Sequence, residues 1–297
     1  MSRPKLTNPK VVNEMLSREG VKLSHSLGQN FLINESIIQK ILKLADVKEK
    51  ERILEIGPGI GVLTAALLEA GASVVSIEKD SRLAGLLLDN ISFAKDNFKL
   101  IEGDALEIDK LKHSIYVNNS EKLVANLPYN IAATLIFDYF WNFKGLKSAT
   151  VMVQKEVAQR MMAKQGTKNY GAYTVKLSLL VDVNGYFFVG RNNFLPAPHV
   201  DSCVIRLDRI SDEDEVIPHS VLQSACVAAD AAFFSRRKTI LNSMLAYFAC
   251  NSASFALNKE EISEVLDKCD IDPRRRGETL GKNDFISLGR LFEKMAK

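Results

Sequence analysis

The stretch that decides the fold is "RILEIGPGIGVLTAALLEAGASVVSIE", residues 52–78. An apolar run of strand length, RILEIG (52–57), enters a glycine-rich turn, and the turn opens VLTAALLEAGA (62–72), a helical segment that Gly71 closes. A second run of strand length, SVVSIE (73–78), follows. Neither run alternates cleanly between polar and apolar residues, which is typical of strands that helices cover on both faces. The stretch therefore predicts a parallel α/β sheet.

The same pattern continues to residue 154. Apolar runs of strand length recur at FKLIEGD (98–104), KLVANLP (122–128) and SATVMVQ (148–154). Two later runs, 181–189 and 202–210, predict an antiparallel pair that closes the sheet. We expect a Rossmann-like α/β fold with a mostly parallel, seven-stranded sheet.

The composition changes after residue 210. The acidic stretch SDEDEV (211–216) breaks strands and is interpreted as a linker. In DAAFFSRRKTILNSMLAYF (230–248), apolar residues recur at spacings of three and four, which predicts one amphipathic helix. We therefore expect an α/β domain over residues 1–210 and a small helical domain over residues 211–297.

Bulk composition excludes several classes of protein. The chain has 297 residues and a formal net charge of only +3, so the total charge does not indicate nucleic-acid binding. Its four cysteines and four histidines are scattered without metal-ligand spacing, and free thiols and no metal are expected. The polar N-terminus lacks the apolar region of a signal peptide, and no window resembles a membrane span. A cytoplasmic protein without membrane contact, acting as a monomer, is expected.

The glycine turn and two acids indicate a nucleoside site. Residues 57–61 read G-x-G-x-G, and Val62 occupies the position where a dinucleotide fingerprint needs its last glycine. Glu78 ends the second strand, where an acid commonly binds ribose hydroxyls, and Asp104 ends the third, where it could accept the adenine amino group. A turn without ligand and two helix N-caps are the alternative readings. Together the features favour S-adenosylmethionine, which carries a nucleoside, a positive sulfonium and no pyrophosphate.

The segment NLPY, residues 126–129, indicates a site for a planar amine. The side-chain carbonyl of Asn126 and the backbone carbonyl of Leu127 could accept both hydrogens of an adenine N6 amine, since Pro128 turns the chain there. Tyr129 offers a ring on which an extruded base can stack. Orientation and electrostatics would then lower the barrier. The alternative is a plain Asx/Pro turn with a half-buried tyrosine.

Phe194 is a second aromatic candidate. It lies in the proline-rich loop NNFLPAPHVDS (192–202), where it could close over the other face of the base. A hydrophobic plug beneath the loop explains it equally well. His199 is the only nearby histidine, and a mechanism based on an oriented amine needs no base, so we interpret it as structural.

Taken together, these motifs resemble one family, the KsgA-type (RsmA) ribosomal RNA adenine dimethyltransferases. The matching segments run in order along nearly the whole chain: SLGQNFL (26–32), EIGPGIG (55–61), IEKD (77–80), EGDAL (102–106), NLPYNIA (126–132), FLPAPHVDSCVIRL (194–207), FFSRRKTILNSML (233–245) and RRRGETL (274–280). The segment NPKVVNEML (8–16) resembles the N-terminal extension of the longer bacterial members. We therefore expect a helical extension over residues 1–25 of this chain. Ser24-His25 departs from the basic residues that many members carry, which weakens the case for an RNA contact there.

The resemblance implies a class I S-adenosylmethionine-dependent methyltransferase with a helical RNA-binding domain. The implied reaction is the dimethylation of N6 in two adjacent adenosines of the 3′-terminal hairpin of small-subunit (16S) ribosomal RNA, late in subunit biogenesis. Carried over by position, the base would be held by Asn126, Leu127, Tyr129 and Phe194. The implied cofactor contacts are Asn30, Leu32, Gly57, Glu78, Asp104 and Asn126.

Two basic clusters indicate where RNA could bind. Arg236, Arg237 and Lys238 fall within the predicted helix, and a second cluster follows at Arg274, Arg275 and Arg276. Short runs of basic residues usually lie on a solvent-exposed face without binding a partner. Beside an adenine-N6 site they are better interpreted as phosphate contacts to ribosomal RNA or an immature small subunit.

Three other functions fit some of these features. A protein-glutamine methyltransferase also grips a planar nitrogen, but its turn usually reads N-P-P-Y and it needs no basic helical tail. A large-subunit ribosomal RNA dimethyltransferase of the antibiotic-resistance type would share every catalytic residue and differ mainly in the small domain. An RNA-binding assembly factor is compatible with catalysis.

Overall fold

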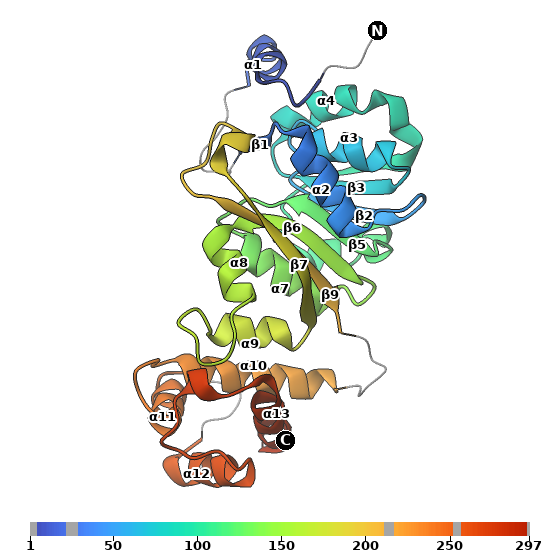
Figure 1. Cartoon of the computed structure of the whole chain (residues 1–297). Helices are drawn as coiled ribbons and strands as arrows, with labels where there is room; N and C mark the ends of the chain where they lie inside the picture. The colour runs from blue at the N-terminus through green and yellow to red at the C-terminus, as the bar shows by residue number, and fades with distance from the viewer. Residues whose placement is uncertain (1–4, 22–28, 211–216, 252–256, 296–297) are drawn as a thin grey trace. The chain divides into compact units, whose positions relative to one another are not determined.

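The computed structural model describes residues 5–21, 29–210, 217–251 and 257–295. The chain forms two compact units (Figure 1). The first comprises Met1–Ala158 and Asp182–Arg209, and the second comprises Gln159–Val181 and Ile210–Lys297. The predicted linker, residues 211–216, and residues 22–28 lie outside the described residues.

The first unit is built on a seven-stranded sheet with the order β4-β3-β2-β5-β6-β9-β7. Neighbours from β4 to β6 are parallel, whereas β6 and β9 are antiparallel. All seven predicted runs form strands, so the predicted fold class is confirmed. Their bounds are β2 Arg52–Ile56, β3 Ser73–Glu78, β4 Phe98–Glu102, β5 Lys122–Asn126, β6 Ser148–Gln154, β7 Val181–Val189 and β9 Ser202–Arg209.

Both faces of the central strands β2, β5 and β6 are buried, as their unbroken apolar runs require. On one face, Ile53, Val124 and Met152 join one core cluster with residues of the first four helices. On the other face, Leu54, Leu123 and Val151 are at most 1% exposed. Figure 1 shows α7 on the side of the sheet away from α2 and α3. The helices of this unit are α1 Pro9–Arg18, α2 Glu35–Ala45, α3 Val62–Glu69, α4 Ser81–Asn90, η2 Ser92–Asn97, α5 Ile108–Leu111, α6 Ile115–Asn118, α7 Ala132–Asn142 and η3 Arg191–Asn193, and α8 Lys155–Met161 leads from this unit into the second.

A short two-stranded sheet fixes the segment that precedes α2. Strand β1, Phe31–Leu32, pairs antiparallel with β8, Phe194–Leu195. The Asn34 side chain also donates to Asn193 Oδ1 at 2.7 Å. Residues distant in sequence are thereby held together beside the main sheet.

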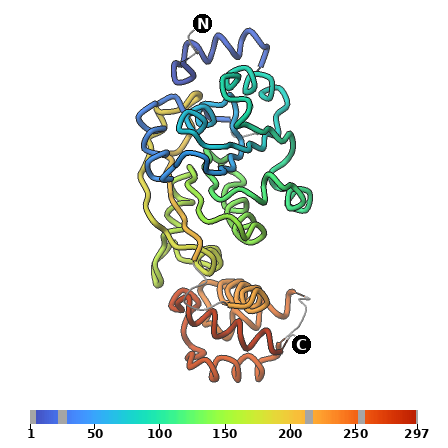
Figure 2. The backbone as a smooth tube through the Cα atoms, turned by 90° about the vertical axis from the view of Figure 1, so that its right-hand side faces the viewer, coloured from blue at the N-terminus to red at the C-terminus, as the bar shows by residue number. Residues whose placement is uncertain are grey.

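The second unit is helical. Helices α10 to α13, orange to red in Figure 2, pack with α9 around a core that includes Val175, Ala228 and Phe285. Tyr170 donates to the Leu280 carbonyl at 2.9 Å, and Lys176 pairs with Asp230 at 2.9 Å. The bounds are α9 Ala172–Ser178, α10 His219–Phe233, α11 Ile240–Cys250, α12 Lys259–Lys268, η4 Gly277–Thr279 and α13 Lys282–Met295.

Two expectations about this unit differ from the structure. The boundary was expected at residue 210, and the second of the two stretches that form this unit begins at Ile210. The other stretch, Gln159–Val181, was expected in the α/β domain but packs in this unit. The single helix predicted over residues 230–248 is wrong, because it divides into α10 and α11. Thr239 caps α11 by accepting from the Asn242 N–H, so the basic residues 236–238 lie in the connecting turn.

Among the described helices, none combines the length and the apolar character that a membrane crossing needs.

Candidate active site

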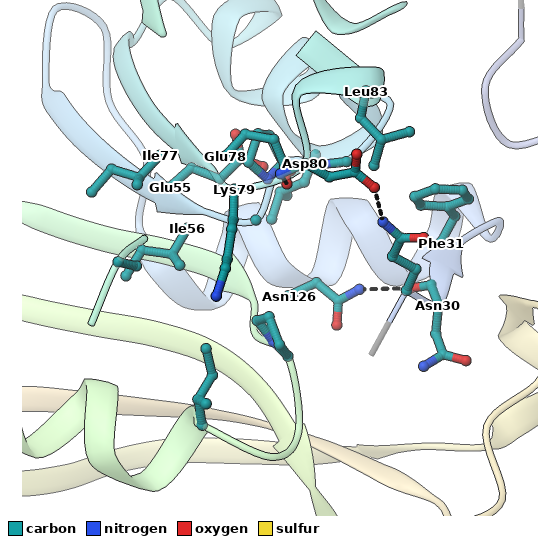
Figure 3. Close-up of a pocket in the computed structure, with 18 of the residues that line it drawn as sticks. Asn30, Phe31, Glu55, Ile56, Ile77, Glu78, Lys79, Asp80, Leu83 and Asn126 are labelled. Atoms are coloured by element: carbon teal, nitrogen blue, oxygen red, sulfur yellow. Dashed lines mark hydrogen bonds between the residues drawn. The ribbon is translucent and has the colours of Figure 1, made fainter. Parts of the chain in front are cut away.

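The carboxyl ends of the parallel strands form one edge of a pocket. The order of strands reverses between β2 and β5, and in open α/β sheets such a switch point leaves a crevice for ligands. Figure 3 shows side chains from β2, β3 and β5 converging there. Of the predicted site residues, the pocket is lined by Asn30, Leu32, Gly57, Glu78, Asp104 and Asn126, whereas Leu127, Tyr129 and Phe194 are not among its lining residues.

The glycine turn needs glycine at each position for a physical reason. Gly57, Gly59 and Gly61 have φ values of 66°, 59° and 88°, in the left-handed region. A Cβ on Gly59 would lie 2.7 Å from Phe31 Cε1, and one on Gly61 would lie 2.7 Å from Leu87 Cδ1. The turn can therefore pack against Phe31 of β1 and begin α3 only with glycine at these positions.

Glu78 is held by backbone amides at the end of β3. Its Oε1 accepts from the Asp80 N–H at 2.8 Å and its Oε2 from the Gly59 N–H at 3.1 Å. The residue is 7% exposed, and this burial raises the pKa of the carboxyl group above its usual value. Asp80, not Glu78, is the N-cap of α4. A carboxylate has about four lone-pair sites, so Glu78 can still accept from a ligand hydroxyl beside these backbone amides.

Asp104 follows β4 and faces the same pocket. Its Oδ2 pairs with Lys79 Nζ at 2.7 Å, and its Oδ1 accepts from the Leu106 N–H at 3.0 Å. The ammonium of Lys79 is the main reason that the pKa of Asp104 lies below its usual value. The side chain forms a local turn and is not the N-cap of α5, which is Glu107.

Glu55 is a pocket residue that the sequence analysis missed. It is 1% exposed on β2, and its Oε2 accepts from Thr64 Oγ1 at 2.6 Å and from Ser76 Oγ at 2.9 Å. Burial raises the pKa of Glu55 to about 7, although both hydrogen bonds oppose the shift. An acid in a buried strand directly before the glycine turn was the signal that could have revealed it.

The amide of Asn126 ends β5 with its two polar atoms in different roles. Its Nδ2 donates to the Asn30 carbonyl at 3.0 Å (Figure 3). Because a carbonyl can only accept, this contact determines which end of the amide is nitrogen. Among the described residues, no hydrogen bond reaches Oδ1. The side-chain carbonyl is therefore free to accept from a ligand.

The rest of the NLPY turn is also anchored. The Leu127 N–H donates to the Met152 carbonyl at 3.1 Å, and no hydrogen bond within the described residues uses the Leu127 carbonyl. The Tyr129 hydroxyl lies 2.6 Å from Oγ of Ser202, which is fully buried. Burial raises the pKa of this phenol, so it stays protonated. The hydroxyl points inward, while the residue keeps intermediate exposure.

Phe194 lies in the core. It is 3% exposed, pairs with Leu32 across β1 and β8, and packs in the same cluster as Phe31. In this arrangement it presents no face to a base. This burial favours the hydrophobic plug, and the role of Phe194 as a second stacking ring stays a prediction.

The two basic clusters adjoin each other in the second unit. The Ile240 N–H donates to the Arg275 carbonyl at 2.7 Å, and Arg236 pairs with Glu278 at 3.0 Å. Arg274 pairs with Asp272 at 2.9 Å.

The remaining basic residues differ in their pairing. Arg275 bonds to Thr279 and lies 4.0 Å from an oxygen of Asp284. In the described part of the chain, Arg237, Lys238 and Arg276 are exposed and have no ion pair. These three are the cations best able to meet a phosphate.

Within the residues described, no three His, Cys, Asp or Glu side chains gather into a possible metal site.

Comparison with known proteins gives consistent matches over nearly the whole chain. The model of a family described as "Ribosomal RNA adenine dimethylase" matches residues 20–286. "Ribosomal RNA small subunit methyltransferase A" of Geobacillus thermodenitrificans is 38% identical over 293 residues, covering 95% of each chain. The protein of the same name from Clostridium botulinum is 38% identical over 275 residues, covering 93% of this chain and 96% of its own.

Two solved structures are similar in fold. A dimethyladenosine transferase from Plasmodium falciparum has a TM-score of 0.72 and 28% identity, and the match covers 88% of this chain and 96% of that one. The 23S ribosomal RNA methyltransferase ErmE has a TM-score of 0.61 and 24% identity, covering 88% and 98%, which shows the fold alone.

The sheet order and the acid-lined pocket at its switch point, with these neighbours, define a class I S-adenosylmethionine-dependent methyltransferase. The chain belongs to the ribosomal RNA adenine dimethylase family. The resemblance read from the motifs is thereby confirmed, as is the prediction that the chain is an enzyme of this class.

Proposed function

We propose that this chain transfers methyl groups from S-adenosylmethionine to N6 of two adjacent adenosines in the 3′-terminal hairpin of small-subunit ribosomal RNA. Each adenosine would become N6,N6-dimethyladenosine. Full-length relatives at 38% identity are named for the small subunit, which supports this target. The observation that carries the proposal is the oriented amide of Asn126, with Nδ2 bonded to Asn30 and Oδ1 left to accept.

The pocket suits the proposed cofactor. Glu78 offers oxygens with spare lone pairs to ribose hydroxyls, and the glycine turn lets a ligand approach the backbone. Among the charged residues that line the pocket, Glu55, Glu78, Asp80 and Asp104 are acids and Lys79 is a base, and this excess of acids favours a ligand with a positive sulfonium. S-adenosylmethionine, when bound, supplies an electrophilic methyl group.

The chain's own residues orient and activate the amine. The N6 lone pair of adenine is delocalised into the ring, so the amine is a weak nucleophile. Asn126 Oδ1 and the Leu127 carbonyl accept its two hydrogens, which favours a pyramidal nitrogen whose lone pair faces the cofactor. The Ser202 contact tethers Tyr129 by its hydroxyl, which leaves the ring as a stacking surface for the base.

In the second unit, we propose that Arg237, Lys238 and Arg276 supply the main phosphate contacts of the RNA hairpin. Arg236, Arg274 and Arg275 share their charge with Glu278, Asp272 and Asp284 and contribute less.

A methylation assay with labelled cofactor tests the substrate. Undermethylated small subunits, large subunits and release-factor protein would be offered in parallel. We expect label in small-subunit RNA alone, as N6,N6-dimethyladenosine. Label only in large-subunit RNA would favour the antibiotic-resistance type of enzyme, and label only in protein would exclude an RNA substrate.

The variant Asn126→Ala tests the role proposed for the oriented amide of Asn126. Loss of one preorganised hydrogen-bonding group typically lowers kcat by about 10²–10³-fold. We expect that loss in the small-subunit assay. The exposed Asn119→Ala serves as a matched control and should behave like the unaltered chain. An Asn126→Ala variant that retains full activity would contradict the proposed role.

A further inference from the structure

Strand β7 carries two exposed aromatic rings at the edge of the sheet. Tyr186 is 53% exposed and Phe188 is 50% exposed, and their ring centroids lie 5.6 Å apart in an edge-to-face arrangement. Since alternate residues of a strand share a face, both rings project from the same face. Rings of this size usually bury most of their surface, so two half-exposed neighbours indicate a binding surface.

A cation accompanies these rings. Lys155, the exposed first residue of α8, places Nζ 5.2 Å from the centroid of the Phe188 ring. Its backbone N–H donates to the Asp201 carbonyl at 3.0 Å, which fixes the start of α8 beside the segment before β9. The patch thus combines aromatic faces with one positive charge, as single-stranded nucleic-acid sites do.

The patch is linked through the start of β9 to the turn proposed to hold the target base. Ser202, next in sequence to Asp201, bonds to the Tyr129 hydroxyl at 2.6 Å. The thiol of Cys203, one residue further, interacts with the backbone of Phe187, the residue before Phe188. A chain of direct contacts therefore runs from Tyr129 through the start of β9 to Lys155 and Phe188.

We propose that Lys155, Tyr186 and Phe188 bind an unpaired nucleotide that flanks the target adenosine. The base of that nucleotide stacks on the exposed rings, and the ammonium of Lys155 meets its phosphate. The site rests on the proposed RNA function and extends it, because it would help to hold the strand open while the target base is extruded.

Two features favour RNA over a second copy of the chain. Gly185, at φ 140°, interrupts the regular geometry of the edge strand, which disfavours the addition of another strand. Two rings and one lysine also offer far less area than the roughly 800 Å² per partner of a stable protein interface.

Kinetics on small subunits test the site. The double variant Tyr186→Ser/Phe188→Ser should raise KM for undermethylated small subunits about tenfold, in line with the loss of base stacking, with kcat and cofactor affinity nearly unchanged. Val183→Ser, 40% exposed on the same strand and outside the pair of rings, is the matched control. An unaltered KM in the double variant, while the parent chain methylates small subunits, would overturn the site and leave the proposed function standing. A parent chain without that activity would instead refute the proposed function.

A fluorescence reporter covers the case in which the double variant fails to fold. Phe188→Trp, in a Trp141→Phe background, places the only indole of the chain in the patch. Stacking predicts that small subunits quench this indole and that Val183→Trp in the same background is not quenched. If small subunits change the fluorescence of the Phe188→Trp and Val183→Trp variants equally, the proposed nucleotide site is wrong. It is also wrong if the parent chain forms a dimer that dissociates in the Tyr186→Ser/Phe188→Ser variant.

Discussion

At the scale of single residues, the amide of Asn126 is informative because its two ends have different partners. Nδ2 donates to the carbonyl of Asn30, 96 residues earlier in the chain, and Oδ1 is left for a ligand. The motif NLPY predicted an acceptor at this position. Local sequence could not predict the contact that orients it, because long-range contacts hold Asn30 at the pocket, namely the pairing of β1 with β8 and the hydrogen bond from Gln29 to Asp80.

Glu55 gives a prediction about pH. Its pKa rises from 4.5 to about 7 on folding, so the folded chain holds more protons than the unfolded chain between these values. The contribution of Glu55 to stability is therefore greatest at low pH and falls as pH rises towards 7, by about 3 kcal/mol at roughly 1.36 kcal/mol per pH unit. Glu55→Gln, which stays neutral, should lack this loss and be the more stable protein at pH 8 without ligand.

Denaturant unfolding from pH 4 to pH 8 measures the difference between the two proteins. Glu102→Gln, at an exposed position on β4, is the control and should follow the parent curve. If Glu55→Gln and the parent lose stability in parallel as pH rises, Glu55 does not titrate as the structure indicates.

At the scale of elements, the strands were predictable because burial on both faces leaves unbroken apolar runs. The error over residues 230–248 has a local cause, because apolar spacing continues across the turn and conceals the cap at Thr239. Strands β1 and β8, two residues each, are too short for any pattern. The place of Gln159–Val181 depends on contacts with α10 and η4, such as Lys176 with Asp230 and Gly166 with Glu278, which a linear reading cannot reveal.

Gly59→Ala tests the turn between β2 and α3. A left-handed φ costs a residue with a side chain about 1–2 kcal/mol, and here the added Cβ would also lie 2.7 Å from the buried ring of Phe31. Gly20→Ala is the matched control, because its φ of 64° is similar and nothing lies within 4 Å of its added Cβ.

We expect Gly59→Ala to lose more free energy of unfolding than Gly20→Ala, and to bind S-adenosylmethionine much more weakly in a calorimetric titration. Equal losses in the two variants, with unchanged affinity for the cofactor, would show that the fit of the turn against Phe31 is not needed.

At the scale of the whole molecule, the α/β unit carries the chemistry and the helical unit carries most of the proposed RNA contacts. The net charge of +3 does not reveal this division of roles between the two units. Within the basic clusters, three of the six cations are paired with the acids Glu278, Asp272 and Asp284. The sequence placed both clusters correctly on the helical unit. It could not distinguish paired from unpaired cations, since the pairing depends on the fold of residues 272–284.

Replacing Arg237, Lys238 and Arg276 together with glutamine should weaken binding of the RNA hairpin. Each lost phosphate contact should lower the slope of log K against log salt by about 0.7–0.9, measured between about 50 and 200 mM salt. Arg274→Gln, which removes a cation already paired with Asp272, should change the slope least. A slope that the triple variant leaves unchanged would remove these residues from the RNA interface.

The most direct measurement is a crystal structure of the chain with a cofactor analogue and adenosine. We predict the adenine amine within hydrogen-bond distance of Asn126 Oδ1 and the Leu127 carbonyl, with the purine against the ring of Tyr129. An adenosine bound elsewhere, or an amine turned away from both oxygens, would contradict this arrangement.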